Sequence, residues 1–353
     1  MTVTTLRSAK LSAGAVFERI GGTEAAAHYG DAASEYATVR EAAGLVDRSD
    51  RGHLLVTGSD RARFLHGMLS NTVEGLESGA GNYATMTTPR GQTLSDVWVY
   101  HRAEGFLLET EPGLQAKLMA SLDKYLIADD VRITDVTGIR ATLGLHGSGS
   151  RALIARVLGE VSSDLADCHT VVRGLGRTDV SVTARSYSGE PGYDLRIEAA
   201  HALRLWNALT AAGARPVGTR AMEALRIESG IPRYGVDVDE RVVPLEAGLH
   251  HAVDFTKGCF IGQETIAKMH NLGKPRRYLV GLCLEADTVP PPETPLRDGE
   301  KQIGWTTSGV RSPALERVVS LASVRRGYEQ PGLFLSVGGV GRAKVVELPF
   351  FRR

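Results

Sequence analysis

Alternation of hydrophobic and polar positions predicts β-strands through much of the chain, with stretches of helical spacing between them. Strands are expected at residues 45–47, 53–57, 82–86, 94–100, 106–108, 131–136, 141–145, 180–185 and 193–197. Helices are expected over 31–43, 200–212 and 219–229, and also after Asp60 and after Pro112. Leu114, Leu118, Leu122 and Leu126 recur every four residues, so we expect them to face a hydrophobic core.

The C-terminal part of the chain has a different pattern. Prolines at 290–292 and 295 predict a stiff connector. Beyond it, short β-like runs cover residues 303–307, 318–324, 333–337 and 343–348. This spacing predicts a small antiparallel barrel or sandwich.

Composition narrows the class of protein. With 353 residues the chain is too long for one ordinary core, so two or three domains are expected. Lys plus Arg equals Asp plus Glu at 41 each, which disfavours general binding to nucleic acid or to an anionic membrane. The sequence has no apolar run of membrane-spanning length. Three widely spaced cysteines predict reduced thiols and a cytoplasmic protein, and no Cys/His cluster predicts a metal site.

Several familiar motifs are absent or misleading. Residues 147–152 fit the dinucleotide fingerprint G-x-G-x-x-A, but the strands around them are expected to be antiparallel, so an ordinary strand-to-helix turn is the better interpretation. G-x-S-x-G, a Walker loop and H-E-x-x-H do not occur. His250 and His251 are neighbours and would point to opposite faces of an extended segment, which disfavours one shared metal.

The run Lys257-Gly258-Cys259-Phe260-Ile261-Gly262-Gln263-Glu264 is the segment densest in reactive groups. A thiol is a nucleophile only as the thiolate, which a nearby lysine and the amides of a starting helix favour. Residues 265–269 are the expected helix, entered through Gly262. The alternative is that Cys259 is a small buried apolar residue in a turn.

Four segments carry a resemblance to a known family. They are His28-Tyr29-Gly30 with residues 40–47, then 187–193 (Y-S-G-E-P-G-Y), 224–230 (A-L-R-I-E-S-G) and 244–249 (P-L-E-A-G-L), and the resemblance continues through 304–309 (G-W-T-T-S-G) to the end. In this order they resemble the folate-dependent family of the glycine cleavage T protein, an aminomethyltransferase, and of the YgfZ-type folate-binding proteins. The resemblance implies an α+β, three-domain aminomethyltransferase-like fold around a central channel for tetrahydrofolate, with a C-terminal antiparallel β-barrel.

The resemblance also sets expected domain boundaries. Residues 1–50 with 140–255 would form a discontinuous folate-binding first domain, and 51–139 a second α+β domain. Residues 256–275 would hold the signature segment and connector, and 276–353 the barrel domain.

Two features separate the members of this family. T proteins carry paired aspartates after an N-E-x-G-G turn, whereas this chain has Pro89-Arg90-Gly91 followed by Ser95-Asp96. Serine cannot carry the negative charge that helps a proton move, and in a strand Asp96 faces the opposite side. K-G-C-[FY]-x-G-Q-E is similar to the YgfZ signature. We therefore expect Cys259 as the functional thiol, with Asp96 as the candidate for acid–base work.

The resemblance also implies folate-binding residues. Glu190 would accept the adjacent N–H donors of the pteridine, and Arg226 would contact the ligand's carboxylate. Lys257 and the aromatic residues complete the expected cofactor-binding set, which includes Tyr83, Tyr187, Tyr193 and Tyr234. Without the resemblance, the alternative interpretation is that Glu190 is a turn residue, that Arg226 is a solvated helix position and that the tyrosines belong to the core.

Three functions follow as expectations. The first is a cytoplasmic, tetrahydrofolate-binding protein of the YgfZ type, whose partners are iron–sulfur enzymes or their assembly factors. The alternative is a folate-dependent aminomethyltransferase, similar to the T protein, or a demethylase. The third is a scaffold that kept the fold and lost the ligand.

Overall fold

The computed structural model describes residues 4–20, 23–271 and 273–350, and the contacts of the chain divide it into two compact units. Unit 1 comprises Met1–His66, Thr72–Tyr83 and Val97–Met222. Unit 2 comprises Gly67–Asn71, Ala84–Asp96 and Glu223–Arg353. The chain therefore leaves unit 1 and returns to it twice. The finer domain boundaries expected from the sequence stay a prediction.

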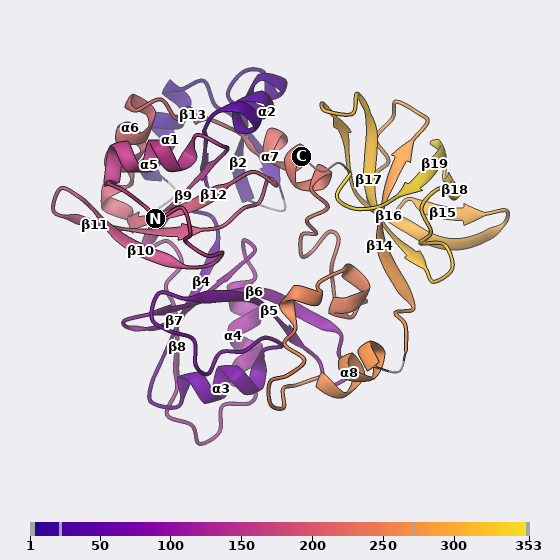
Figure 1. The fold of residues 1–353 in the computed structure, drawn as a ribbon, viewed down its shortest axis with the longest axis horizontal. Coiled ribbons are helices and arrows are strands. Elements are labelled where there is room, and N and C mark those ends of the chain that lie inside the picture. The colour runs from indigo at the N-terminus through magenta and orange to yellow at the C-terminus, as the bar shows by residue number, and fades with distance from the viewer. Residues whose placement is uncertain (1–3, 21–22, 272, 351–353) are drawn as a thin grey trace. The chain divides into compact units, whose positions relative to one another are not determined.

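The helices are short and agree largely with the expected ones (Figure 1). They are α1 (Thr4–Ser12), α2 (Ala32–Glu41), α3 (Arg61–Met68), α4 (Gln115–Asp123), α5 (Ser150–Leu158), α6 (Ala202–Ala211), α7 (Thr219–Glu228) and α8 (Gln263–Asn271), with 3₁₀ turns η1 (Ala199–His201), η2 (Pro244–Ala247) and η3 (His250–Ala252). Asp31 starts α2 by accepting hydrogen bonds from the amides of Ala33 and Ser34. Leu118 and Leu122 are buried as predicted, but α4 ends before Leu126.

The strands of the described residues form three open sheets and one closed barrel. A two-stranded sheet pairs β1 (Val16–Ile20) with β2 (Thr23–His28). A six-stranded sheet has the order β10 (Thr170–Leu175), β11 (Thr178–Ala184), β12 (Gly192–Glu198), β9 (Arg140–His146), β3 (Gly44–Asp47), β13 (Arg215–Pro216). A five-stranded sheet has the order β5 (Gly81–Thr87), β6 (Thr93–Arg102), β7 (Gly105–Thr110), β4 (Gly52–Thr57), β8 (Arg132–Asp135).

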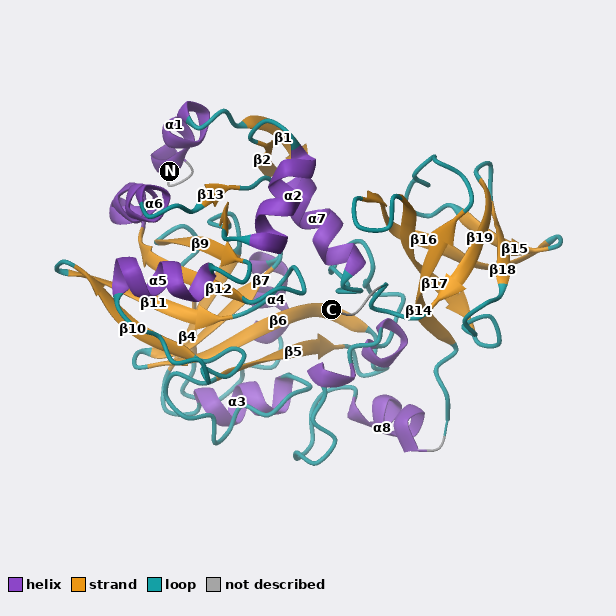
Figure 2. Cartoon of the chain, turned by 45° about the horizontal axis from the view of Figure 1, so that its top comes forward, coloured by secondary structure: helices purple, strands orange, loops and turns teal. Residues whose placement is uncertain are grey.

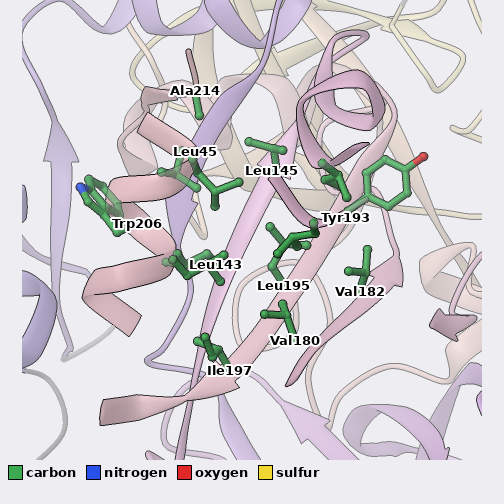
Figure 3. Packing of buried hydrophobic residues seen from close by; sticks show 14 of the residues in the cluster. Leu45, Leu143, Leu145, Val180, Val182, Tyr193, Leu195, Ile197, Trp206 and Ala214 are labelled. Carbon is green, nitrogen blue, oxygen red and sulfur yellow. The ribbon is translucent and has the colours of Figure 1, made fainter. Parts of the chain in front are cut away.

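One face of the six-stranded sheet packs into the main apolar core of unit 1 (Figure 3). Leu143 and Leu145 of β9 meet Leu195 and Ile197 of β12, and α6 covers them with Trp206. Because side chains alternate along a strand, Asp194 and Arg196 of β12 point to the other face. That face carries the charged groups described below.

The C-terminal strands close into the antiparallel barrel that the sequence predicts (Figure 2). Their order is β14 (Arg277–Leu284), β17 (Arg317–Arg325), β16 (Lys301–Ser312), β15 (Pro295–Asp298), β18 (Phe334–Val337), β19 (Gly341–Val346), with β14 paired to β19. β14 and β15 were not predicted. Pro295 was assigned to a connector but begins β15, a position at which the missing amide hydrogen is tolerated.

The turn at residues 147–152 is not a dinucleotide site. β9, which precedes it, pairs antiparallel with both β3 and β12, so no parallel βαβ unit surrounds the turn. Gly147 has φ of +120°, and a Cβ there would lie 2.3 Å from the carbonyl oxygen of Ala42. This glycine therefore allows the close approach of two backbone segments, in agreement with the interpretation from the sequence.

A second close approach joins the 257–264 segment to the turn between β5 and β6, within unit 2. Gly262 has φ of +85°, and a Cβ there would lie 2.4 Å from Thr87 Oγ1 and 2.6 Å from the carbonyl oxygen of Thr88. Thr87 Oγ1 also donates a hydrogen bond of 2.5 Å to the carbonyl oxygen of Ile261. The two sequence features expected to distinguish YgfZ-type proteins, the Pro89-Arg90-Gly91 turn and the 257–264 segment, therefore lie against each other.

The Gly262→Ala substitution is expected to lower the free energy of unfolding by about 1–3 kcal/mol, because alanine disfavours positive φ and its methyl group would meet backbone. Gly67→Ala is the matched control, since a Cβ at Gly67 has open space and alanine favours the helix α3. Differential scanning calorimetry of both variants measures the effect. Equal melting temperatures for Gly262→Ala and the unchanged protein would show that the close approach does not exist in solution.

Candidate functional site

Glu190 lies in the turn between β11 and β12 and is fixed by an ion pair. Its Oε1 accepts a hydrogen bond of 2.8 Å from Arg40 Nη1 of α2, and both side chains are at least nine-tenths buried. Arg40 Nε donates in turn to the hydroxyl of Tyr36 at 3.0 Å. Ser186 Oγ donates to the Glu190 carbonyl at 2.6 Å. A buried carboxylate held this rigidly suits a planar ligand with adjacent N–H donors.

Tyr187 belongs to a stack of aromatic rings and guanidinium groups beside this turn. The Arg48 guanidinium lies 3.3 Å from the centroid of the Tyr187 ring, and the Arg185 guanidinium lies 4.3 Å from it. Arg185 also covers the Trp98 ring at 3.6 Å, and Tyr83 packs on Trp98 with ring centroids 4.5 Å apart. Two of the expected cofactor-binding tyrosines, Tyr83 and Tyr187, are thus connected through one stack in unit 1.

Tyr193 is placed differently. It lies on β12 in the apolar core, and its side chain is 8% exposed. Figure 3 shows its hydroxyl pointing away from the neighbouring Leu195 and Val182. Burial raises the pKa of the Tyr193 phenol. A folate contact of Tyr193 stays a prediction.

Behind the stack lies a buried charged cluster that the sequence did not reveal. Glu109 of β7 accepts hydrogen bonds from Arg51 Nε at 3.1 Å, from Arg185 Nη1 at 2.6 Å and from Arg196 Nη2. Burial alone would raise the pKa of Glu109, but the guanidinium groups of Arg185 and Arg196 outweigh it and hold the pKa well below its usual range. Glu109 is therefore ionised, and its charge is shared among three arginines.

Asp194 of β12 is the second carboxylate of this cluster. It accepts a hydrogen bond of 3.2 Å from Arg48 Nη1 and one of 2.7 Å from the Tyr187 hydroxyl. His146 of β9 is fully buried next to Tyr187, with ring centroids 5.4 Å apart. Burial lowers the pKa of His146 to about 3, so its imidazole is neutral at pH 7. These contacts hold Tyr187 at a fixed angle beside the Glu190 turn.

Arg226 of α7 joins three parts of unit 2. Nη1 donates to Asp237 Oδ2 at 2.8 Å and to the Ile231 carbonyl at 2.6 Å. Nη2 donates to Ser308 Oγ of β16 at 2.7 Å and to Glu223 at 2.5 Å, and Nε donates to Glu223 at 3.0 Å. All five N–H groups of Arg226 therefore have protein acceptors. A ligand carboxylate would have to replace one of them, and the expected folate contact stays a prediction.

Ser95 and Asp96 both lie on β6 and are both buried, with exposed fractions of 1% and 5%. Ser95 Oγ donates to the carbonyl oxygen of Asp96 at 2.7 Å. The hydroxyl of Tyr234 donates to the Leu94 carbonyl one residue earlier. The structure thus places Tyr234, Ser95 and Asp96 on one short stretch of unit 2. The acid–base role expected for Asp96 stays a prediction.

The segment from Lys257 to Glu264 is anchored by its lysine. Lys257 Nζ donates to the carbonyl oxygens of Leu69 and Asn71, at 2.6 and 3.0 Å, and lies 5.2 Å from the centroid of the Phe260 ring. The expected helix is present as α8 (Gln263–Asn271). Lys257 therefore holds the loop in place through backbone carbonyls.

Cys259 is exposed, which disagrees with the alternative interpretation of a buried apolar residue. The other two thiols differ from it. Cys168 is buried and Cys283 is partly buried, and burial raises the pKa of each thiol. Cys259 is thus the most exposed of the three thiols.

Sequence reasoning missed Arg48, Glu109, Arg185, Asp194 and Arg196. One signal was present, because Asp194 and Arg196 occupy alternate positions of a strand whose other positions are apolar. Within residues 4–20, 23–271 and 273–350, no group of three or more His, Cys, Asp or Glu side chains is arranged to hold a metal ion. Among the helices of those residues, none has the length and apolar character needed to cross a membrane.

Comparison with known proteins assigns both parts of the chain to one family. The GCVT N-terminal domain matches residues 6–257, and the glycine cleavage T-protein C-terminal barrel domain matches residues 277–352. An aminomethyltransferase of Moorella thermoacetica is 34% identical, covering 99% of this chain and 98% of the relative. One from Rubrobacter xylanophilus is 33% identical, covering 96% and 91%.

A solved structure extends the likeness to the fold. The crystal structure of glycine cleavage system aminomethyltransferase T from Bartonella henselae is similar with a TM-score of 0.88 and 25% identity, covering 98% of this chain and 97% of that chain. The expected aminomethyltransferase-like fold is therefore confirmed. With both family domains matched and full-length relatives above 30% identity, the chain belongs to the glycine cleavage T-protein (GCVT) family.

Proposed function

We propose that the protein binds tetrahydrofolate and transfers a one-carbon unit to or from it, as an aminomethyltransferase or a related demethylase. The observation that carries this proposal is the buried carboxylate of Glu190, fixed by Arg40 in a chain whose full-length relatives are named aminomethyltransferases. Tetrahydrofolate is the cofactor that aminomethyltransferases of this family use, in agreement with the cofactor expected from the sequence.

Four of the candidate residues have a defined part in this proposal. Glu190 accepts the two adjacent N–H donors of the pteridine, and Arg40 prevents the carboxylate from turning away. The rings of Tyr83 and Tyr187 offer apolar faces to the ligand, held in position by Trp98 and Arg185. Asp96 accepts or returns the proton that moves when the carbon unit leaves its nitrogen or sulfur.

A second candidate function has its own supporting observation. Ser95 stands where T proteins are expected to have an acidic residue, and the exposed thiol of Cys259 lies in a segment packed on the Pro89-Arg90-Gly91 turn. These features favour a YgfZ-type protein that binds tetrahydrofolate and supports iron–sulfur enzymes through Cys259. In this case folate binding is retained and transfer of an aminomethyl group is absent.

Glu190→Gln keeps the size of the side chain and removes its charge. We expect the Kd for tetrahydrofolate to rise about tenfold or more, because charge-assisted hydrogen bonds are worth about 1.5–3 kcal/mol. Anaerobic calorimetric titration measures it. Glu198→Gln, at the exposed end of β12, is the control. An unchanged Kd in a Glu190→Gln protein that melts normally would remove Glu190 from the ligand site.

Asp96→Asn tests the transfer step separately from binding. The rate of methylenetetrahydrofolate formation from an aminomethylated lipoyl carrier, or of methyltetrahydrofolate from a methylated amine, should fall about 10²–10⁴-fold. The Kd for tetrahydrofolate should stay within a few-fold of its original value. Asp123→Asn, at the exposed end of α4, should leave the rate unchanged. If the unchanged protein forms no product with either donor, the transferase proposal fails.

Cys259→Ala tests the second function. In a strain lacking this protein, the unchanged chain should restore the activity of iron–sulfur enzymes, and Cys259→Ala should not. Cys283→Ala, in the partly buried β14 position, controls for loss of a thiol in general. Full rescue by Cys259→Ala would show that the thiol has no part in such a function.

A further inference from the structure

A cavity of about 250 Å³ lies in unit 1, away from the Glu190 turn. It has room for about eight water molecules at roughly 30 Å³ each. Arg196, one of its lining residues, follows Gly192 by four positions along β12, which is roughly 13 Å of strand. Glu190 precedes Gly192 at the opposite end of the same strand. The cavity is therefore separate from the proposed folate contacts.

The lining of the cavity combines an apolar wall with cationic groups. Leu107, Val136 and Ile139 contribute apolar surface, and Ile139 is 60% exposed although it is a large hydrophobic residue. Three arginines line the cavity, Arg102, Arg140 and Arg196, against one carboxylate, Glu104. Such a lining suits a ligand with an apolar body and an anionic head group.

Arg196 forms the buried end of this lining, with 2% of its surface exposed. Its Nη2 donates to Glu109, and its Nη1 donates to Thr183 Oγ1 at 3.3 Å. Its Nε–H has no hydrogen-bond acceptor among the residues that the structure describes. Because protein encloses this Nε, Arg196 contributes positive charge at the buried end of the cavity and does not offer a free donor to a ligand.

Arg102 reaches the same cavity from the end of β6. Its Nη2 lies 3.5 Å from Thr183 Oγ1, and its guanidinium lies 5.4 Å from the centroid of the Tyr100 ring. Burial, and then the like charges of Arg196 and Arg140, lower the pKa of Arg102 to about 10. Tyr100 and, after it, Glu104 act in the opposite direction on the pKa of Arg102.

We propose that this cavity is a second ligand site, which binds a small organic carboxylate with an apolar body. The carboxylate lies against Arg102, whose guanidinium offers a fork of donors that matches its two oxygens, and the positive charge of Arg196 acts on the same position. The apolar body lies against Leu107, Val136 and Ile139. Inorganic phosphate has no apolar body and would leave the apolar wall without a contact, whereas a carboxylate on an apolar body meets both parts of the lining.

Calorimetric titration of the full chain with cyclohexanecarboxylate tests the proposal. The acid should bind saturably. The neutral cyclohexanecarboxamide lacks the negative charge and inorganic phosphate lacks the apolar body, so each should bind at least about tenfold more weakly. Equal affinity for the acid and the amide would overturn the proposal, as would absence of saturable binding of the acid. Binding of phosphate as tight as that of the acid would overturn the assigned ligand class.

Two variants with opposite expected effects on the affinity for the acid test where it binds. Arg102→Gln should weaken binding of the acid about tenfold, and the chain should still fold because it loses an unfavourably placed charge. Glu104→Gln should tighten binding about two- to fivefold, because it removes an exposed like charge. Saturating tetrahydrofolate should leave the affinity of each variant for the acid unchanged. Displacement of the acid by tetrahydrofolate, or an Arg102→Gln affinity equal to that of the unchanged chain, would contradict the assignment.

Discussion

The charged side chains buried on one face of β12 must each be paired, and this requirement organises unit 1. Asp194 and Arg196 alternate with Leu195 and Ile197, so the strand has an apolar face in the core and an ionic face opposite. Removing one partner of a buried ion pair costs several kcal/mol, about 3–5 in typical cases. Glu109 therefore has to stay in place, and the arginines that share it are fixed in turn.

The proposed sites lie towards the two ends of this ionic face. At the start of β12, Asp194 holds Tyr187 through its hydroxyl, and Arg185 joins Tyr187 to Trp98 and Tyr83. The Glu190 turn precedes the strand directly. Further along the strand, Arg196 lines the buried end of the cavity and brings positive charge to it. The same cluster that stabilises the sheet thus also positions the groups proposed to bind ligands.

Unit 2 is held by local anchors of a different kind. Arg226 uses its five donors to join α7, the 231–237 loop and the barrel strand β16. Lys257 is tied to two backbone carbonyls, and Gly262 brings its segment against the Thr88 carbonyl. These contacts leave Cys259 exposed on a fixed loop. Arg226, which was expected to bind folate, therefore joins parts of unit 2. Lys257, which was expected to favour the thiolate of Cys259, holds its loop in place.

The sequence predicted those helices, strands and turns that are determined by residues close together along the chain. The helix beginning near Asp31, the leucine spacing of α4 and the β-runs of the barrel were all recognisable. The turn at residues 147–152 was correctly interpreted as an ordinary strand-to-helix turn. What the sequence did not reveal depends on residues far apart along the chain. Arg48 and Asp194 are 146 positions apart, and four-residue β15 begins at a proline that resembles a linker. Such pairings exist only after the sheets have formed.

The family assignment makes tetrahydrofolate binding the central claim, because both candidate functions require it. The most direct measurement is an anaerobic calorimetric titration of the unchanged full chain with tetrahydrofolate. The account predicts saturable binding at one site per chain. A folded chain that shows no saturable binding would contradict it and would favour a scaffold that has kept the fold without the ligand.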